Sequence, residues 1–429
     1  MTTVLLRFKY RIYPTVAQQR SIARIFGCAR VVFNDGLRLR QDAHERGLPY
    51  ISDGDLSKMV ITEAKKGADR SWLSAAPAAV LQQALADLNA AYRNYFQSIS
   101  GQRRGPRMGL PRFRSRKDKR QSVRFTSNTR FKVLCNGKLR LPKVGELKVR
   151  WSRPLPGTPS SVTVIRDSAG RHFASFVVLV DREPLPGNDR EVGIDLGLSD
   201  FAVLSDGTKF AAPQFLRRAE RKIRRLQRDL ARKQRGSSNR AKARQKVARA
   251  HARVADTRRD WLHKLSTTIV RESQAVYVED LAVSGLARTH LAYSVHDAGW
   301  AQFTAMLEYK AARYGRTFSK VGRWFPSTRT CSECGLVGGK RALHVRRWTC
   351  PCGVTHDRDV NAAKNIRAAG RADLNDRGAQ VRPGLVPAQR REAVTRRKSV
   401  PSGDADRPGS RTSRGRQLIM PFGADGVRQ

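Results

Sequence analysis

Residues 331–366 read CSECGLVGGKRALHVRRWTCPCGVTHDRDVNAAKNI, and they hold two kinds of site side by side. Four cysteines come first, as Cys331-x-x-Cys334 and Cys350-x-Cys352, with fifteen residues between the pairs. This pattern is typical of a structural zinc site, because each tight turn presents two sulfur atoms to one tetrahedral ion. Two disulfides are the alternative, but we expect no signal peptide that would take the chain to an oxidising compartment.

The second part of this stretch predicts a helix that begins near Asp359. Ala362, Ala363 and Ile366 follow three, four and seven residues later, so they share a helix face with Asp359. This face is small and apolar, and we expect it to pack on a β-sheet and to hold Asp359 there. The alternative is that Asp359 caps the helix N-terminus, where aspartate is a favoured residue.

The charge of the chain points to a polyanionic partner. The 429 residues carry 84 Lys+Arg against 36 Asp+Glu, which gives a net charge of +48. Because arginine occurs throughout, the folded body itself is basic, as expected for a protein with an extended nucleic-acid footprint. A membrane surface is the competing partner, but the sequence has no apolar run long enough to cross a bilayer and no lipidation signal. We therefore predict nucleic acid and no membrane.

The N-terminal half predicts a small β-barrel with a helical insertion. Residues 3–13 alternate between apolar and basic side chains, as a half-buried strand does. Residues 121–180 predict several antiparallel strands, with a tight turn at Asn136-Gly137. Between them, residues 80–96 form an amphipathic helical pattern whose polar side carries Gln82. Gln82 could read base edges, although a solvated helix face is the commoner explanation.

Residues 101–124 combine glycine and proline with dense arginine and lysine, so they have little to bury. We interpret them as a basic loop that becomes ordered on a phosphate backbone, and a flexible linker is the alternative. The candidate nucleic-acid contacts in this loop are Arg103, Arg104, Arg112, Arg114, Lys117 and Lys119.

Two more carboxylates stand out in the C-terminal half. Asp195 lies in the middle of an otherwise apolar strand, where an unpaired carboxylate is costly and cation binding is the natural explanation. Glu279 follows the apolar run at residues 275–278, which predicts a strand buried on both faces. Side chains at the carboxyl ends of such strands often form active sites. Between them, residues 216–265 predict a long basic helical hairpin.

Together Asp195, Glu279 and Asp359 offer the oxygen ligands that hard divalent cations prefer. Two Mg²⁺ ions that share a carboxylate can activate a water and stabilise the leaving 3′ oxygen in phosphodiester hydrolysis. The order of a strand hairpin, a third strand, a helix, a buried strand and a helix fits an RNase H-like nuclease fold. The sequence therefore predicts a metal-dependent nuclease.

Several motifs along almost the whole chain resemble the TnpB family, the RuvC-type proteins of small insertion-sequence transposons, which are related to type V CRISPR nucleases. The motifs are YRIYPTVAQ (10–18), GLPRFRSRKDKRQSVRF (109–125), GIDLGLSDFAVLSDG (193–207), VYVEDL (276–281), WFPSTRTCSECG (324–335) and WTCPCGVTHDRDVNAAKNI (348–366). The resemblance implies an RNA-guided DNA endonuclease that acts in the prokaryotic cytoplasm, associated with the nucleoid. It would bind a transposon-derived guide RNA and cut double-stranded target DNA next to a short recognition motif.

By motif position, Asp195, Glu279 and Asp359 would be the three RuvC acids, holding two Mg²⁺ ions, or Mn²⁺ in their place. The family spaces its second thiol pair as Cys-x-x-Cys, whereas this chain has Cys350-Pro351-Cys352. The shorter spacing strains the chelate or lets His344 or His356 act as a ligand.

The resemblance also implies a multidomain α+β architecture. The expected parts are a wedge-like β-barrel (1–14 and 121–185), a helical recognition insertion with the basic loop (15–120), a RuvC-like domain (190–328 and 356–370), a zinc-binding insertion (329–355) and a mostly disordered basic tail (371–429). Two other functions stay open: a nuclease-inactive, RNA-guided DNA-binding regulator of transposition, and a transposase that acts in DNA recombination.

Overall fold

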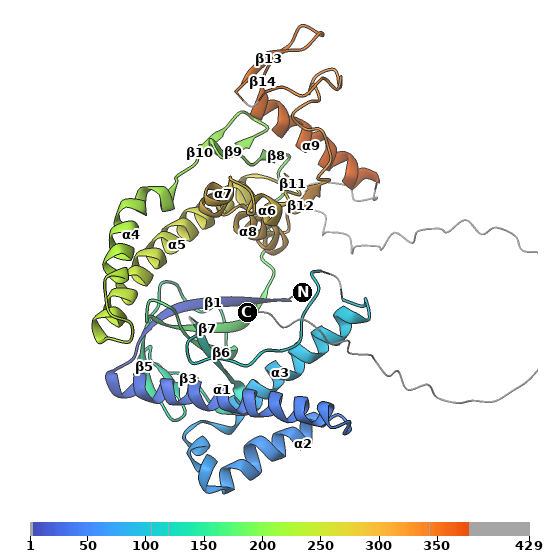
Figure 1. Ribbon diagram of the computed structural model, residues 1–429. Helices are drawn as coiled ribbons and strands as arrows, with labels where there is room; N and C mark the ends of the chain where they lie inside the picture. Colours follow the sequence, from blue (N-terminus) through green and yellow to red (C-terminus); the bar gives the residue numbers. More distant parts are fainter. Residues whose placement is uncertain (1–2, 104, 119, 343, 377–429) are drawn as a thin grey trace, which may run out of the picture. The chain divides into compact units, whose positions relative to one another are not determined.

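The N-terminal half is built on one antiparallel sheet. The structure, a computed structural model, describes residues 3–376 with the exception of 104, 119 and 343. The sheet has seven strands in the order β2-β6-β7-β1-β5-β4-β3 (Figure 1). The strands are β1 (Thr3–Tyr13), β2 (Gln121–Thr126), β3 (Lys132–Val133), β4 (Leu139–Leu141), β5 (Gly145–Arg150), β6 (Pro159–Arg166) and β7 (His172–Asp181).

Helices are inserted between β1 and β2, as the sequence predicts. They are α1 (Val16–Glu45), α2 (Asp53–Ser57), the π-helical η1 (Lys58–Glu63), the 3-10 segments η2 (Ala64–Lys66) and η3 (Ala68–Ala75), and α3 (Ala78–Ile99). Thr15 and Gln18 form a capping box that begins α1 directly after the strand. Alternate residues of β1, among them Phe8 and Tyr10, are buried in one core with apolar residues of α1 and α3. The helices thus cover one face of this sheet.

The expected small β-barrel is an open sheet in the described part of the chain. The pairings run from β2 at one edge to β3 at the other, and among the described residues no pairing joins these two strands. The strand β3 has two residues, and the 3-10 segment η4 (Ser127–Thr129) separates it from β2. So short an edge strand offers few backbone groups for closure.

The C-terminal half is built on a second sheet of five strands, in the order β10-β9-β8-β11-β12 (Figure 1). Its strands are β8 (Glu191–Asp195), β9 (Asp200–Leu204), β10 (Lys209–Ala211), β11 (Ala275–Glu279) and β12 (Thr317–Val321). The strands β8, β9 and β10 are antiparallel neighbours, whereas β11 runs parallel to both β8 and β12. The carboxyl ends of β8, β11 and β12 therefore lie at the same edge.

Helices cover both faces of this second sheet, with α5 (Ser238–Glu272) and α8 (Trp300–Tyr314) on one face and α9 (Arg358–Asp376) on the other. The other helices of this half in the described residues are α4 (Phe215–Ala231), α6 (Val283–Leu286) and α7 (Ala292–Ala298). Val276 and Val278 of β11 lie in one core with residues of α5 and α8, whereas Tyr277 packs with Ile366 of α9. The long basic hairpin predicted from the sequence is α4 and α5. The short strands β13 (Arg347–Thr349) and β14 (Thr355–Asp357) form a separate pair before α9.

The expected boundary of the basic tail is wrong by a few residues. The helix α9 continues to Asp376, so residues 371–376 are helical rather than part of the tail. The helix is continued because Gly370 packs closely on Tyr277 and Arg371 lies 3.8 Å from Glu191. The remainder of the expected tail, residues 377–429, lies outside the described residues.

The helix α9 approaches β8 at backbone distance, and this predicts a strong effect of one substitution. A Cβ atom on Gly193 would lie 2.1 Å from the carbonyl oxygen of Ala363 and 2.6 Å from the amide nitrogen of Arg367. We expect Gly193→Ala to lower the free energy of unfolding by about 1–3 kcal/mol, the usual range for overpacking. Thermal unfolding followed by circular dichroism measures this. Gly109→Ala is the control, since nothing lies within 4 Å of a Cβ there; equal stability of both variants would contradict the close packing.

Candidate functional site

Two of the candidate carboxylates lie at the same edge of the second sheet and on the same face. Asp195 is the last residue of β8 and Glu279 is the last residue of β11. Gly193 and Tyr277, two residues earlier in each strand, both pack against α9. Because side chains alternate along a strand, Asp195 and Glu279 also face α9. The structure thus places Asp195 at the strand end, not in the middle of the strand as expected.

The third carboxylate comes from α9 itself and is not the cap of that helix. Asp357 fills the capping role, since its carboxylate accepts from the backbone N–H groups of Asp359 and Val360 at 3.1 Å. The Nζ atom of Lys209 donates to the other oxygen of Asp357 at 2.6 Å, which ties β10 to the start of α9. The side chain of Asp359, in the first turn of the helix, is therefore not needed as the cap.

One arginine contacts the carboxylate of Asp359. The Nη1 atom of Arg346 lies 3.2 Å from Oδ2 of Asp359, and its Nη2 atom donates to the hydroxyl of Ser199 at 3.2 Å. Arg346 precedes β13, between the two cysteine pairs. The cysteine-rich segment thus reaches into the carboxylate site through this guanidinium group.

Asp195 is the carboxylate whose pKa is most strongly affected by this site. Burial, together with the negative charges of Asp359 and Glu279, raises the pKa of Asp195 to about 7. Burial first, and the neighbouring Asp280 second, also raise the pKa of Glu279. In the described structure neither Asp195 nor Glu279 has a side-chain hydrogen bond or an ion pair. A divalent cation would relieve this repulsion and satisfy the oxygen atoms.

The carboxylates are neighbours without being gathered around a single point. Within the described ranges, the four cysteines form the only group of three or more His, Cys, Asp or Glu residues whose ligand atoms all lie within 4.8 Å of one another. The carboxylates therefore interact through charge, and a bound cation would have to draw them closer together.

The cysteines meet as the sequence predicts and could hold one metal ion. Sγ of Cys331 lies 3.8 Å from that of Cys352, and Sγ of Cys334 lies 3.6 Å from that of Cys350. The donor set fits a tetrahedral Zn²⁺ ion. Of the two histidines that the short Cys350-x-Cys352 spacing left open, His344 is exposed, while the Nε2 atom of the buried His356 lies 3.0 Å from Sγ of Cys331.

Two buried asparagines that the sequence analysis did not single out connect the two sites. Asn361 accepts from the backbone N–H of Ser332 at 2.9 Å and donates to the carbonyl of Thr330 at 2.8 Å. Asn365, one turn later, donates to the carbonyls of Ser327 and Thr330. They hold the loop before Cys331 against α9. Their four-residue spacing on an otherwise small, apolar helix face was the available signal.

The expected nucleic-acid contacts lie on α3 and in the loop after it. Gln82 is exposed on α3, Arg112 and Lys117 are exposed in the loop, and Arg103 is partly exposed. Arg114 has protein partners: its guanidinium group pairs with Asp87 at 3.1 Å and stacks on Phe33. The protein itself thus orders the loop at Arg114. Arg104 and Lys119 lie outside the described residues.

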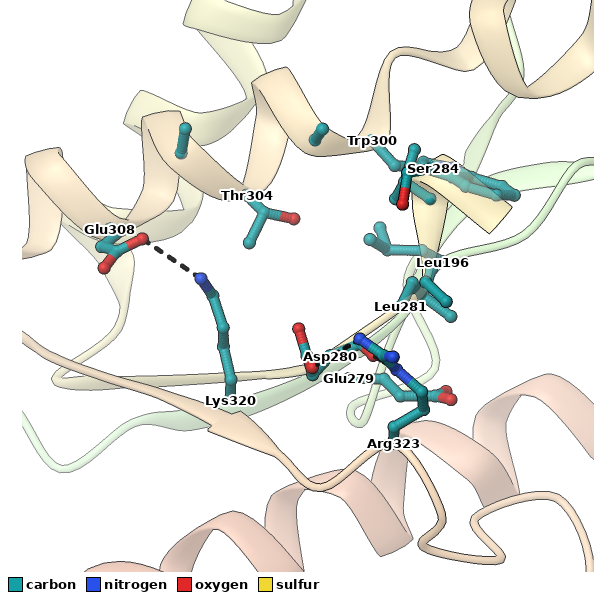
Figure 2. Close-up of a pocket in the computed structure, with 14 residues that line it drawn as sticks. Leu196, Glu279, Asp280, Leu281, Ser284, Trp300, Thr304, Glu308, Lys320 and Arg323 are labelled. Carbon is teal, nitrogen blue, oxygen red and sulfur yellow. Dashed lines mark hydrogen bonds and ion pairs between the residues drawn. The ribbon is translucent and has the colours of Figure 1, made fainter. Parts of the chain in front are cut away.

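A cavity with a volume of about 340 Å³ opens beside Glu279, at the end of β11. Figure 2 shows that the side chains of Glu279 and Asp280 leave the strand end in different directions. Asp280 accepts from Nη2 of Arg323 at 3.0 Å, and Lys320 pairs with Glu308 across the cavity at 3.3 Å. The cavity therefore has charged walls next to a candidate metal ligand.

Parts of the chain match three known families. The family described as "Probable transposase" matches residues 175–290, and the "Cas12f1-like, TNB domain" matches residues 300–366. A "Helix-turn-helix domain" matches residues 1–48, where the structure has β1 followed by the single long helix α1.

The chain is also similar to whole proteins. A "Putative RNA-guided DNA endonuclease" of Streptomyces pristinaespiralis is 44% identical over 407 residues, which cover 93% of this chain and 96% of that protein. InsQ of Escherichia coli (strain K12), which has the same description, is 32% identical over 388 residues. The match covers 86% of this chain and 93% of InsQ. The structure of a Cas12f1-sgRNA-target DNA complex aligns with a TM-score of 0.53 and 13% identity, over 85% of this chain and 99% of the Cas12f1 chain.

The fold is thus that of the solved Cas12f1 chain, with a Cas12f1-like TNB segment that contains the cysteines. The chain belongs to the TnpB family of transposon-encoded proteins. Among its described helices, none combines the length and the apolar character that a membrane crossing requires.

The raised pKa of Asp195 predicts a pH-dependent effect on stability that requires no catalysis. Between pH 3.8 and about 7 the folded state holds a proton on Asp195 that the unfolded state has released, so rising pH costs stability at this site. We expect Asp195→Asn to raise Tm at pH 8 in the presence of a chelator, and to raise it less at pH 5. Differential scanning calorimetry measures both values.

Added Mg²⁺ is the control for this experiment, because it should raise the Tm of the wild type more than that of the variant. A lower Tm for Asp195→Asn at pH 8 would show that charge repulsion does not act at this position.

Proposed function

We propose that this protein is an RNA-guided, Mg²⁺-dependent DNA endonuclease that cuts target DNA next to a short recognition motif. The observation that supports the proposal most strongly is the position of Asp195, Glu279 and Asp359 at one sheet edge, on the face that α9 covers. The relatives described as RNA-guided DNA endonucleases support the reaction class.

In this proposal the three carboxylates would together hold two Mg²⁺ ions, or Mn²⁺ in their place. Bound there, such ions would supply activation of a water and stabilisation of the leaving oxygen of a phosphodiester. Asp195 must lose its proton to act as a ligand, so its pKa of about 7 makes the ionised form available at neutral and higher pH. Asp357 holds the start of α9 in place, and Arg346 orients the carboxylate of Asp359, which would be one of the groups that hold the cation.

The domains follow from this assignment. The second sheet with α5, α8 and α9 would be the RuvC-like, RNase H-like nuclease domain, formed by residues 190–328 and 356–376. Residues 329–355 would be its zinc-binding insertion. The first sheet would be the wedge, with the helices and the basic loop of residues 15–120 as the recognition part.

The partners we propose are a transposon-derived guide RNA and double-stranded target DNA. The Cas12f1 neighbour was solved with a guide RNA and target DNA, and the net charge of +48 suits two polyanionic partners. The helix α4 adds a dense row of arginines, including Arg218, Arg221 and Arg225. We place the protein in the cytoplasm, associated with the nucleoid.

Removal of one candidate ligand tests the nuclease assignment. We expect Asp195→Ala to lower cleavage of guide-matched plasmid by more than about 100-fold, because a charge-stabilising ligand is lost from the metal site. Filter binding of the same DNA should stay within about threefold. Glu191→Gln is the matched control, since Glu191 lies on the same strand and face at the opposite end.

Cleavage that survives Asp195→Ala would remove this residue from the mechanism. Tight RNA and DNA binding by the wild type with no cleavage at any Mg²⁺ concentration would instead favour a nuclease-inactive regulator of transposition.

We further propose that the four cysteines bind one structural Zn²⁺ ion, with His356 hydrogen-bonded to the thiolate of Cys331. We expect about one zinc per chain by elemental analysis, and loss of most of it in Cys352→Ser. Removal of the imidazole in His356→Ala should weaken zinc binding by about 10–100-fold, the usual cost of losing an outer-shell partner. The exposed His344 serves as the control, and His344→Ala should keep its zinc. If Cys352→Ser kept its zinc and His344→Ala lost it, His344 rather than Cys352 would be the ligand.

A further inference from the structure

Trp324 is the most exposed of the large apolar side chains in the described part of the chain, with 91% of its surface accessible. It belongs to the WFPSTRT segment that leads from β12 to the first cysteine pair. The hydration of so exposed an apolar ring is unfavourable in free energy, and the ring contributes nothing to the core. A partner that covers the ring is the natural reason for such a position.

The backbone around Trp324 is held in place on both sides. Nε of the preceding Arg323 donates to the carbonyl of Asp280 at 3.1 Å, and its Nη2 pairs with the carboxylate of Asp280. On the other side, Phe325 packs against the core that includes Tyr277, Val321 and Ile366. The N–H of Phe325 also closes a turn onto the carbonyl of Gly322 at 3.0 Å. The indole is thus presented to solvent from a fixed turn.

This turn lies at the sheet edge that carries the candidate metal ligands. Glu279 and Val321 are register partners in the parallel pair of β11 and β12, and Trp324 follows Val321 by three residues. Lys320 and Arg323 line the cavity beside Glu279 (Figure 2), and Arg323 directly precedes Trp324 in the turn. Aromatic rings next to cationic groups are the usual elements of a surface that binds single-stranded nucleic acid.

We propose that Trp324 stacks on an unpaired base of the target DNA strand and positions that strand at the carboxylate site. The inference rests on the proposed nuclease function and adds a positioning residue to it. Stacking on an aromatic ring tolerates any base, which suits a nuclease whose sequence specificity comes from its guide RNA. The fixed turn limits the conformational entropy that the indole loses on binding.

Photo-crosslinking tests this contact directly. The full-length protein, in its Asp195→Ala form so that DNA is not consumed, is mixed with single-stranded DNA that contains 5-iododeoxyuridine, and is then irradiated. Trypsin cuts after Arg323 and Arg329, so residues 324–329 are released as one peptide that mass spectrometry can identify. We expect the crosslink on this peptide, and we expect none on the peptide that contains Trp72, another exposed indole, in η3.

Three substitutions separate stacking from simple apolar contact. At a salt concentration that suppresses phosphate contacts, Trp324→Ala should weaken binding of the same oligonucleotide by roughly 5- to 150-fold, the value of one stacked base. Trp324→Phe should retain most of the affinity, and Trp324→Leu should behave like the alanine variant. In cleavage assays of the otherwise wild-type protein, Trp324→Ala should raise KM more than it lowers kcat.

Absence of a crosslink on residues 324–329, or equal binding by the leucine and phenylalanine variants, would overturn the stacking role. A crosslink to RNA oligonucleotides alone would assign the base to RNA and overturn the proposal for target DNA. Because crosslinking and binding require no cleavage, their outcome is independent of whether Asp195 acts as a metal ligand.

Discussion

The close approach of α9 to β8 and β11 is the constraint on which the candidate site depends. Gly193 and Gly370 allow it, since a side chain at either position would collide with the other element. With the helix this close, its first turn lies at the sheet edge where β8 and β11 end. Three carboxylates from distant parts of the sequence then lie at one edge of the sheet, where burial and the charges of Asp359 and Glu279 raise the pKa of Asp195. Tight apolar packing and unfavourable charge thus occur together at this edge of the sheet.

The cysteine-rich segment depends on the same helix. Asn361 and Asn365 bind backbone carbonyls of the loop before Cys331, so α9 fixes the position of the first cysteine pair. In turn, Arg346, which lies between the two cysteine pairs, contacts the carboxylate of Asp359 on α9. A change at the cysteines can therefore reach the carboxylates through one guanidinium group and one helix. The cysteine cluster and the carboxylates are thus linked within a short stretch of sequence.

Local patterns in the sequence were sufficient to predict most elements of the second sheet and its helices. The apolar run at residues 275–278, the spacing of Ala362, Ala363 and Ile366, and the paired cysteines each predict what the structure has. Features that depend on distant partners could not be predicted. Asp357 and Asp359 both suit a helix N-terminus, and only the position of Lys209 and the backbone N–H groups shows that Asp357 is the cap. Closure of the first sheet likewise depends on pairing between edge strands, which alternation of apolar residues does not reveal.

The central claim is that Asp195, Glu279 and Asp359 together bind divalent cations. Titration of nucleic-acid-free protein with Mn²⁺, followed by electron paramagnetic resonance, tests it most directly, because free and bound Mn²⁺ give distinct signals. The account predicts saturable Mn²⁺ binding that Mg²⁺ displaces, and that is lost when the three residues are replaced together by their amides. Unchanged Mn²⁺ binding in that triple variant, with its fold intact, would contradict the account.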